Sequence, residues 1–178
     1  MRIQPVLPGT RPELAAVESR ILAERGRISE LYQVLLNSPP IAHGWEQMLS
    51  AVRNRSSLDA GLRELVILRV AVLNGAPYEF NAHVPHAHKA GKSDAAIEAT
   101  RSIPCAADAP WTEQEHLAIR LTDAMTRDIT VADALFAQVQ ARFSAQQQAV
   151  GRYAGISHAF SARSVSYTHL TLPTNREV

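Results

Sequence analysis

Residues 58–91 constrain the fold more than any other part of the chain, because they combine the longest apolar segment with the densest group of histidines. After its first two residues, the segment 58–73 has only Arg63, Glu64 and Arg69 as charged positions. Apolar side chains therefore occupy nearly every face of a helix formed by this segment. Such a pattern predicts a buried helix rather than an amphipathic surface helix.

A second helix is predicted over residues 77–89, directly after the turn-forming pair Asn74-Gly75. The segment opens with a proline, which suits the first turn of a helix. A turn between two such helices makes them double back on each other. This arrangement could bring Glu64 of the first helix toward His83 of the second.

The second helix carries Glu79, His83, His86 and His88. Glu79 and His83 are four residues apart, so one helical turn places both on the same face. His86 follows three residues later and lies near that face, whereas His88 points elsewhere. A carboxylate one turn from an imidazole can orient it and stabilise its protonated form, which suits general acid–base chemistry.

These residues resemble a known family, the carboxymuconolactone decarboxylase family, which includes the alkylhydroperoxidase D-like proteins. The resemblance covers residues 31–97 and is carried by Arg63-Glu64-Leu65, Tyr78-Glu79-Phe80, His83, Ala87 or Ala90, and Gly91. It implies an all-α fold of about seven or eight helices around a central antiparallel helix pair. It also implies homo-oligomers, commonly trimers or hexamers, with sites near the subunit contacts.

The peroxidase branch of the family has a glutamate, a Cys-x-x-Cys pair and a histidine four residues after the second cysteine. Position by position, the glutamate corresponds to Glu64, the histidine to His83, and the two cysteines to Ala76 and Glu79. Both thiols are absent, which argues against thiol peroxidase chemistry. A Glu followed by a His four residues later is instead typical of the decarboxylase-like branch.

The resemblance therefore implies an enzyme that acts on a small carboxylate or lactone without an organic cofactor. In this interpretation His83 is the general acid or base, Glu79 orients it, and Glu64 assists proton transfer. One alternative is an alkylhydroperoxidase-type antioxidant protein, which the missing thiols disfavour. The other is a non-catalytic helical oligomerisation or binding module, in which these three residues make structural contacts only.

The sequence also contains candidates for metal binding and for thiol chemistry. Glu79, His83 and His86 have i, i+4 and i+7 spacing that can bind a metal, but Pro85 interrupts the set and the sequence has no His-Glu-x-x-His motif. The single cysteine, Cys105, has no basic neighbour in the sequence and fits an inert packing thiol. We therefore expect no bound metal and no redox role for the thiol.

Glu64 has a simpler explanation as well, a salt bridge with a neighbouring arginine. Burial would raise the pKa of this carboxyl, and a nearby arginine would lower it. Arg69 is five residues further along, which is off the best spacing for a partner on the same helix.

Bulk properties exclude several classes of partner. The chain has 178 residues and a net charge of +1, so charge gives no argument for nucleic acid or an anionic membrane as a partner. The N-terminus lacks the pattern of a signal peptide, and Arg69 interrupts the longest apolar run. The sequence predicts a soluble cytoplasmic protein with a small-molecule substrate.

The remaining chain predicts helices and no strand. Thr10 and Glu13 fit a capping box before a helix that Gly26 ends, and Ser93 fits an N-cap. The other predicted helices cover residues 28–36, 41–52, 94–100, 112–125, 130–143 and 145–162.

The end of the sequence does not look biological. Residues 165–174 read VSYTHLTLPT, which is also the translation of a common transposase-end sequencing adapter in one frame. We predict that residues 165–178 are adapter read-through in an assembled metagenomic sequence. The prediction is one domain over residues 1–164, and the tail is excluded from it.

Overall fold

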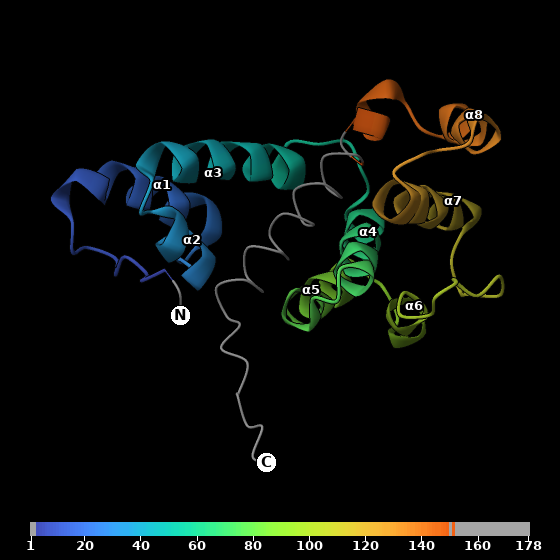
Figure 1. Ribbon diagram of the computed structural model, residues 1–178, viewed down its shortest axis with the longest axis horizontal. Coiled ribbons are helices and arrows are strands. Elements are labelled where there is room, and N and C mark those ends of the chain that lie inside the picture. Colours follow the sequence, from blue (N-terminus) through green and yellow to red (C-terminus); the bar gives the residue numbers. More distant parts are fainter. Residues whose placement is uncertain (1–2, 150, 152–178) are drawn as a thin grey trace, which may run out of the picture. The chain divides into compact units, whose positions relative to one another are not determined.

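The structure is a computed structural model that describes residues 3–149 and 151, and every regular element in that part is helical (Figure 1). Eight α-helices, α1 to α8, lie in residues 15–142, and residues 145–149 and 151 are helical as well. The all-α prediction is therefore confirmed. The chain divides into two compact units, whose described parts are residues 3–55 and residues 56–149 with 151.

The first unit contains a short 3₁₀ turn η1 (Pro12–Leu14) and the helices α1 (Ala15–Arg25), α2 (Glu30–Leu35) and α3 (Pro39–Asn54). Its core is one apolar cluster, formed by Val6, Leu14, Val17, Ile21, Tyr32, Leu36 and Ala42. The cluster joins side chains from each of these elements. It accounts for the helical spacing of apolar residues in this part of the sequence.

The predicted capping box at Thr10 and Glu13 is wrong. The Thr10 hydroxyl donates to the Leu7 carbonyl at 2.6 Å, and the chain enters a 3₁₀ turn before α1 begins at Ala15. Local bonding of this kind competes with capping, because threonine can satisfy a turn carbonyl instead of a helix amide. Gly26 does end α1, with a left-handed φ of 71° that favours glycine.

The second unit is organised around α4 (Ala60–Leu73), which packs against α5 (Pro77–Lys89) and α7 (Glu113–Asp123). It also contains α6 (Asp94–Ala99), a π-helical turn η2 (Ala124–Asp128) and α8 (Asp133–Arg142). Figure 1 shows α4 in green between α5 and α7.

Side chains from several faces of α4 enter separate apolar clusters. Leu62 and Val66 pack with Leu117 of α7, whereas Leu68 packs with Phe80 of α5. Leu65 enters a third cluster, together with Trp111. The prediction that this helix is buried rather than amphipathic is confirmed.

The helix boundaries in the second unit follow the sequence signals closely. The predicted bounds of α5 match those in the structure, and the helix continues through Pro85. Ser93 caps α6 through a bond from the Ala96 amide. Gly91 has a φ of 83° directly after the C-cap of α5, a left-handed conformation that favours glycine.

The main difference lies between α7 and α8. Helix α7 ends at Asp123 rather than residue 125, and α8 begins at Asp133 rather than residue 130. The turn η2 and Ile129, which has a positive φ of 56°, occupy the interval. Residues 145–149 and 151 are helical, while the rest of the predicted 145–162 helix and the 165–178 tail lie outside the described residues.

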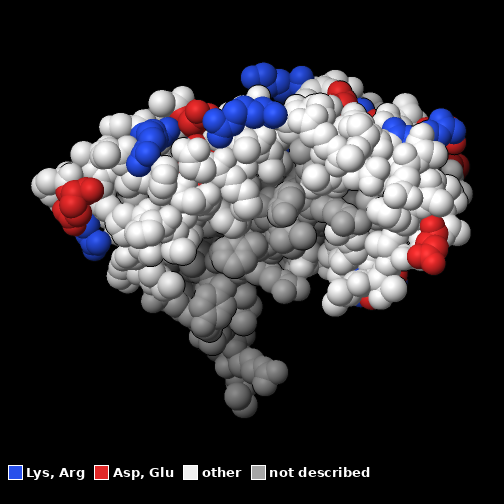
Figure 2. Space-filling view, turned by 90° about the horizontal axis from the view of Figure 1, so that it is seen from above, with Lys and Arg blue, Asp and Glu red and all other residues white. Residues whose placement is uncertain are grey.

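No helix among the described residues combines the length and apolarity needed to cross a membrane. On the face shown in Figure 2, small groups of acidic and basic residues are scattered over a largely uncharged surface, and several of opposite sign lie next to each other. This view agrees with the small net charge of the sequence.

Candidate functional site

Helix α4 fixes the position of Glu64. The helix begins after Asp59, whose carboxylate accepts from the Leu62 amide at 2.8 Å. Glu64 follows in the second turn and is only 3% exposed. A carboxylate buried in so apolar a helix is costly unless other polar groups contact it, so its partners define the site.

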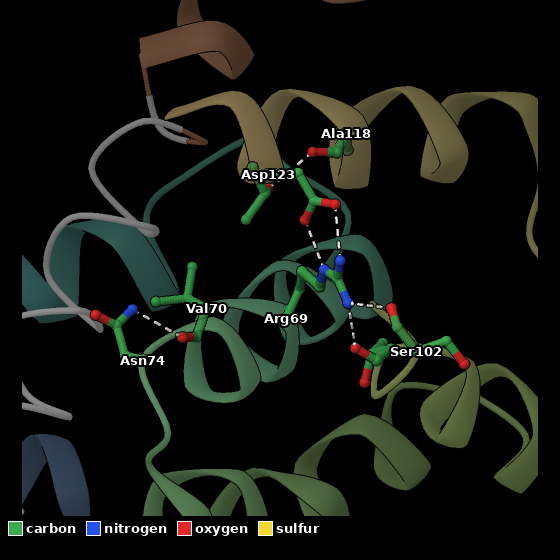
Figure 3. A network of polar contacts seen from close by, with 8 residues as sticks. Arg69, Val70, Asn74, Ser102, Ala118 and Asp123 are labelled. Carbon is green, nitrogen blue, oxygen red and sulfur yellow. Dashed lines mark hydrogen bonds and ion pairs between the residues drawn. The ribbon is translucent and has the colours of Figure 1, made fainter. Parts of the chain in front are cut away.

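The turn between α4 and α5 sets the position of the second helix. Gly75 adopts a φ of 61°, a left-handed conformation that glycine reaches without steric cost. The Asn74 side-chain amide donates to the Val70 carbonyl at 2.9 Å and holds the C-terminus of α4 (Figure 3). Pro77 then opens α5, as its fixed φ allows.

The structure brings the three predicted site residues together. His83 Nδ1 lies 2.7 Å from Glu64 Oε2, and His83 Nε2 lies 3.5 Å from Glu79 Oε1. The imidazole is 5% exposed and Glu79 is 8% exposed. A buried histidine therefore has a carboxylate beside each ring nitrogen, one from each helix of the hairpin.

Arg63 extends this cluster on the side of Glu64. Its Nε lies 3.5 Å from Glu64 Oε1, while the other oxygen of Glu64 faces His83. The simpler explanation of Glu64, a salt bridge with a neighbouring arginine, thus holds together with the histidine contact. When His83 is protonated, two cations face two carboxylates, which offsets part of the cost of burying them.

The arrangement can hold a proton in two distinct ways. In the neutral imidazole, a proton on Nδ1 is donated to Glu64, and this leaves Nε2 as an acceptor. In the imidazolium, both ring nitrogens donate and Glu79 receives the second contact. Because an imidazole can take either form, the cluster contains the groups that acid–base chemistry needs.

The other histidines of α5 lie differently. His86 is exposed, and its ring centroid is 5.5 Å from that of His83 with the planes tilted by 50°. His88 Nδ1 lies 3.1 Å from the Lys92 carbonyl, and its Nε2 lies 3.3 Å from Asp94. Across residues 3–149 and 151, no three His, Cys, Asp or Glu side chains are grouped to hold a metal ion.

Sequence reasoning missed a second buried ionic cluster on α4. Arg69 is fully buried and donates to both carboxylate oxygens of Asp123, from Nε at 2.6 Å and from Nη2 at 2.7 Å. Its Nη1 donates to the carbonyls of Thr100 and Ser102 at 2.8 and 2.7 Å (Figure 3). The available signal was a lone arginine in an apolar helix, with no partner at helical spacing.

A third ionic contact lies beside the N-terminal end of α4. Lys92 pairs with Glu115, which also completes a capping box with Thr112 at the start of α7. Burial opposes ionisation of Glu115, but the hydrogen bonds from Lys92 and Thr112 outweigh it and hold the pKa of this carboxyl below its usual value. The Lys92 side chain crosses Gly61, where a Cβ would lie 2.2 Å from the lysine Cε.

Cys105 lies apart from these contacts. It is half-buried against an apolar cluster that includes Leu65 and Trp111. Burial raises the pKa of the thiol; the charge of Arg69 lowers it in part, and that of Asp123 raises it further. A thiol with a raised pKa is a poor nucleophile at neutral pH.

Comparison with known proteins identifies a matching family and a shared fold. The model of the carboxymuconolactone decarboxylase family matches residues 39–124. No curated protein shows a significant match to the sequence.

Solved structures share the fold at low sequence identity. A cysteine-to-alanine variant of the debrominase Bmp8, in complex with 2,3,4-tribromopyrrole, has a TM-score of 0.76 at 13% identity, over 94% of this chain and 89% of that one. A peroxidase-related protein from Silicibacter sp. TM1040 has a TM-score of 0.74 at 12% identity, over 94% and 92%.

A third structure is ATU0492 of Agrobacterium tumefaciens, a protein of unknown function whose name suggests the antioxidant defence protein AhpD. It has a TM-score of 0.66 at 20% identity, over 75% of this chain and 90% of that one. These likenesses establish an alkylhydroperoxidase D-like helical fold, as the sequence predicted, and no particular activity.

Proposed function

Since residues 39–124 belong to the carboxymuconolactone decarboxylase family, we propose that the protein is an acid–base enzyme acting on a small carboxylate or lactone. One observation carries this proposal: His83 is buried with Glu64 at 2.7 Å from one ring nitrogen and Glu79 at 3.5 Å from the other. The reaction class that fits best is decarboxylation or a related lyase step with proton transfer.

The proposed chemistry uses His83 as the proton donor. In a decarboxylation, the bond between carbon and the leaving carboxylate breaks, carbon dioxide departs, and the electron pair moves into an adjacent carbonyl as an enolate. The enolate carbon then takes a proton from His83 Nε2. Glu64 stays ionised and holds the Nδ1 proton, which fixes the ring and stabilises the imidazolium before transfer.

Glu79 has a different role in this proposal. Its contact with Nε2 is 3.5 Å, at the outer limit of a hydrogen bond. The carboxylate can therefore orient the imidazolium. Because the contact is long, a substrate group can replace Glu79 at Nε2 with little loss of hydrogen-bond energy. Its negative charge also favours the protonated ring, which is the form that donates.

A thiol peroxidase is the first alternative, and the structure gives it little support. Ala76 and Glu79 stand at the start of α5, where the peroxidase pattern has its two thiols. Burial raises the pKa of the remaining thiol, Cys105. Hydroperoxide turnover that is lost in Cys105→Ser would favour this alternative over ours.

A non-catalytic binding or oligomerisation module is the second alternative. The contacts of Glu64 and His83 are compatible with a purely structural role. The debrominase structure, which holds a small halogenated pyrrole, supports a small-molecule ligand in a fold of this kind rather than oligomerisation alone.

The first test is a thermal-shift screen of the full chain against carboxylates, lactones and hydroperoxides, beside His83→Ala and Glu79→Gln. A ligand at 100 times its dissociation constant stabilises the fold by about 2.7 kcal/mol. We expect a carboxylate or lactone to stabilise the parent and to lose this effect in both variants. His88→Ala is the matched control, since His88 lies outside the cluster.

A positive ligand leads to the decisive assay, which is release of carbon dioxide with and without His83. The absence of stabilising ligands, together with destabilised His83→Ala and Glu79→Gln proteins, would contradict the enzyme proposal and favour the structural module. The proposal includes no organic cofactor, and it includes a homo-oligomer of three or six subunits. Light scattering coupled to size exclusion tests the subunit number.

A further inference from the structure

A second imidazole lies beside the buried His83. His86 follows three residues later on α5, so the two side chains occupy neighbouring positions on one helix face. Their ring centroids are 5.5 Å apart and their planes are tilted by 50°. His83 is buried and His86 is exposed. The two rings therefore span the boundary between the protein interior and water.

A buried acid–base group must recover its proton from solvent after each transfer. The carboxylates of Glu64 and Glu79 hold His83 inside the protein, and both are themselves buried. An imidazole titrates near neutrality, so an exposed one can both accept a proton from a buffer acid and give it up. His86 combines that chemistry with a ring contact to His83.

We propose that His86 is the residue through which His83 exchanges its proton with solvent. In the reprotonation step, the His86 imidazolium gives one proton to neutral His83, directly or through one bridging water. Neutral His86 then takes a proton from a buffer acid. The net change is one proton moved from buffer to His83, with no other bond made or broken.

His86 acts through His83 and needs no contact with substrate. The catalytic meaning of this inference rests on the proposed acid–base function. The proton transfer itself does not, because it can be measured in the absence of any substrate.

His88 provides a matched comparison on the same helix. It is also an exposed histidine, only two residues beyond His86. Its ring nitrogens lie 3.1 Å from the Lys92 carbonyl and 3.3 Å from Asp94 Oδ1. Replacing His88 removes an exposed imidazole from α5 and keeps the ring contact between His83 and His86.

The test measures exchange of the His83 ring proton with water, by NMR on the full chain labelled with ¹⁵N-histidine. His83→Gln assigns the signal. We expect His86→Ala and His86→Gln to slow the exchange by about tenfold, less than the ~100-fold or more that a directly acting acid or base supplies. His88→Ala should leave the rate unchanged.

Added free imidazole distinguishes proton transfer by His86 from a purely structural role, because imidazole would not replace a structural contact. It should restore fast exchange in His86→Ala and change the parent little. If exchange broadens the His83 signal beyond detection in the parent, the signal should appear in both His86 variants. The backbone amide spectrum of each variant establishes that the fold is retained.

Three results would overturn the inference: equal exchange in the parent and both His86 variants, slower exchange that imidazole does not restore, or a signal that stays broadened in all proteins. Each result is separate from the ligand and carbon dioxide assays. The acid–base function can therefore fail while the exchange route stands, and the exchange route can fail while the function stands.

Discussion

Helix α4 carries two buried ionic clusters that differ in how firmly their charges are held. Arg69 donates four hydrogen bonds of 2.6–2.8 Å, two of them to Asp123 in a bidentate pair. The Glu64 cluster has one short contact, to His83, and two contacts of 3.5 Å that involve Arg63 and Glu79. Only the second cluster contains an imidazole, a group that exists in a neutral and a protonated form.

The difference separates a clamp from a site that can react. A guanidinium is always charged, and a planar carboxylate matches its geometry, so the Arg69 cluster has a single protonation state to stabilise. The imidazole of His83 has two protonation states, and the longer 3.5 Å contact between its Nε2 and Glu79 is compatible with both. Burial alone therefore does not mark a charge as functional, and the proposed role of His83 depends on its choice of protonation state as well.

The largest expected effect is the loss of the clamp. Arg69→Met should lower the free energy of unfolding by about 3–5 kcal/mol, because Asp123 stays largely buried without its partner. Urea unfolding measures it. Arg142→Met is the control, since that arginine forms an exposed pair with Glu113 and should change stability by less than about 1 kcal/mol.

The double variant Arg69→Met with Asp123→Leu sharpens this prediction. It removes both charges, so it should regain much of the stability lost in the single variant. Equal losses in Arg69→Met and Arg142→Met would show that Arg69 is no clamp.

The third ionic contact, between Lys92 and Glu115, should make stability depend on pH. The pKa of Glu115 is lowered in the folded state from its usual 4.5. Its ionised form therefore stabilises the fold above that value, and the contribution is lost as pH falls through the lower folded pKa. Unfolding free energies between neutral and acidic pH should fall less steeply in Glu115→Gln than in the parent. Parallel curves for the two proteins would contradict this.

Removal of the Glu64 charge should affect stability less than removal of Arg69. Glu64→Gln keeps an acceptor for the His83 ring, and we expect a loss of about 1 kcal/mol in urea unfolding. The same variant should lose the ligand response that defines the acid–base site. If Glu64→Gln lowered the free energy of unfolding as much as Arg69→Met, the result would indicate that both ionic clusters serve stability.

The smallest effect concerns the close approach at Gly61. An added Cβ lies 2.2 Å from Lys92 Cε, so Gly61→Ala displaces the lysine from Glu115. The better helix propensity of alanine, worth about 1 kcal/mol, offsets part of this cost. We expect a net loss of a few tenths of a kcal/mol in the parent. In a Lys92→Ala background, Gly61→Ala should lower the free energy of unfolding by less, or raise it. Equal changes in the parent and in Lys92→Ala would contradict a close approach of Lys92 to Gly61.

The sequence predicted the hairpin of α4 and α5 almost completely, because its signals are local. A run of apolar residues, an Asn-Gly turn and a proline determine two helices and their reversal. Once the helices reverse, Glu64 and His83 face each other, and the i, i+4 spacing adds Glu79. The pairing of these three residues followed from helix periodicity, while their chemical role remains a proposal.

Contacts between distant segments could not be predicted in this way. Arg69 and Asp123 are 54 residues apart, and no periodicity relates them. Thr10 shows a different reason for a wrong prediction. Its sequence fits a capping motif, but its hydroxyl donates to the Leu7 carbonyl instead of capping a helix. The π-helical turn after α7 likewise has no signal in the residues that form it.

The turn at Gly75 also has a consequence for the order in which the protein assembles. It joins Glu64 and His83 across 19 residues, whereas Arg69 and Asp123 must meet across 54. The longer closure costs about 1 kcal/mol more in chain entropy. Contacts of short sequence separation form readily in folding, so the hairpin can bring Glu64 and His83 together before α7 docks. The pair of Arg69 and Asp123 would then form after the geometry of the hairpin is already in place.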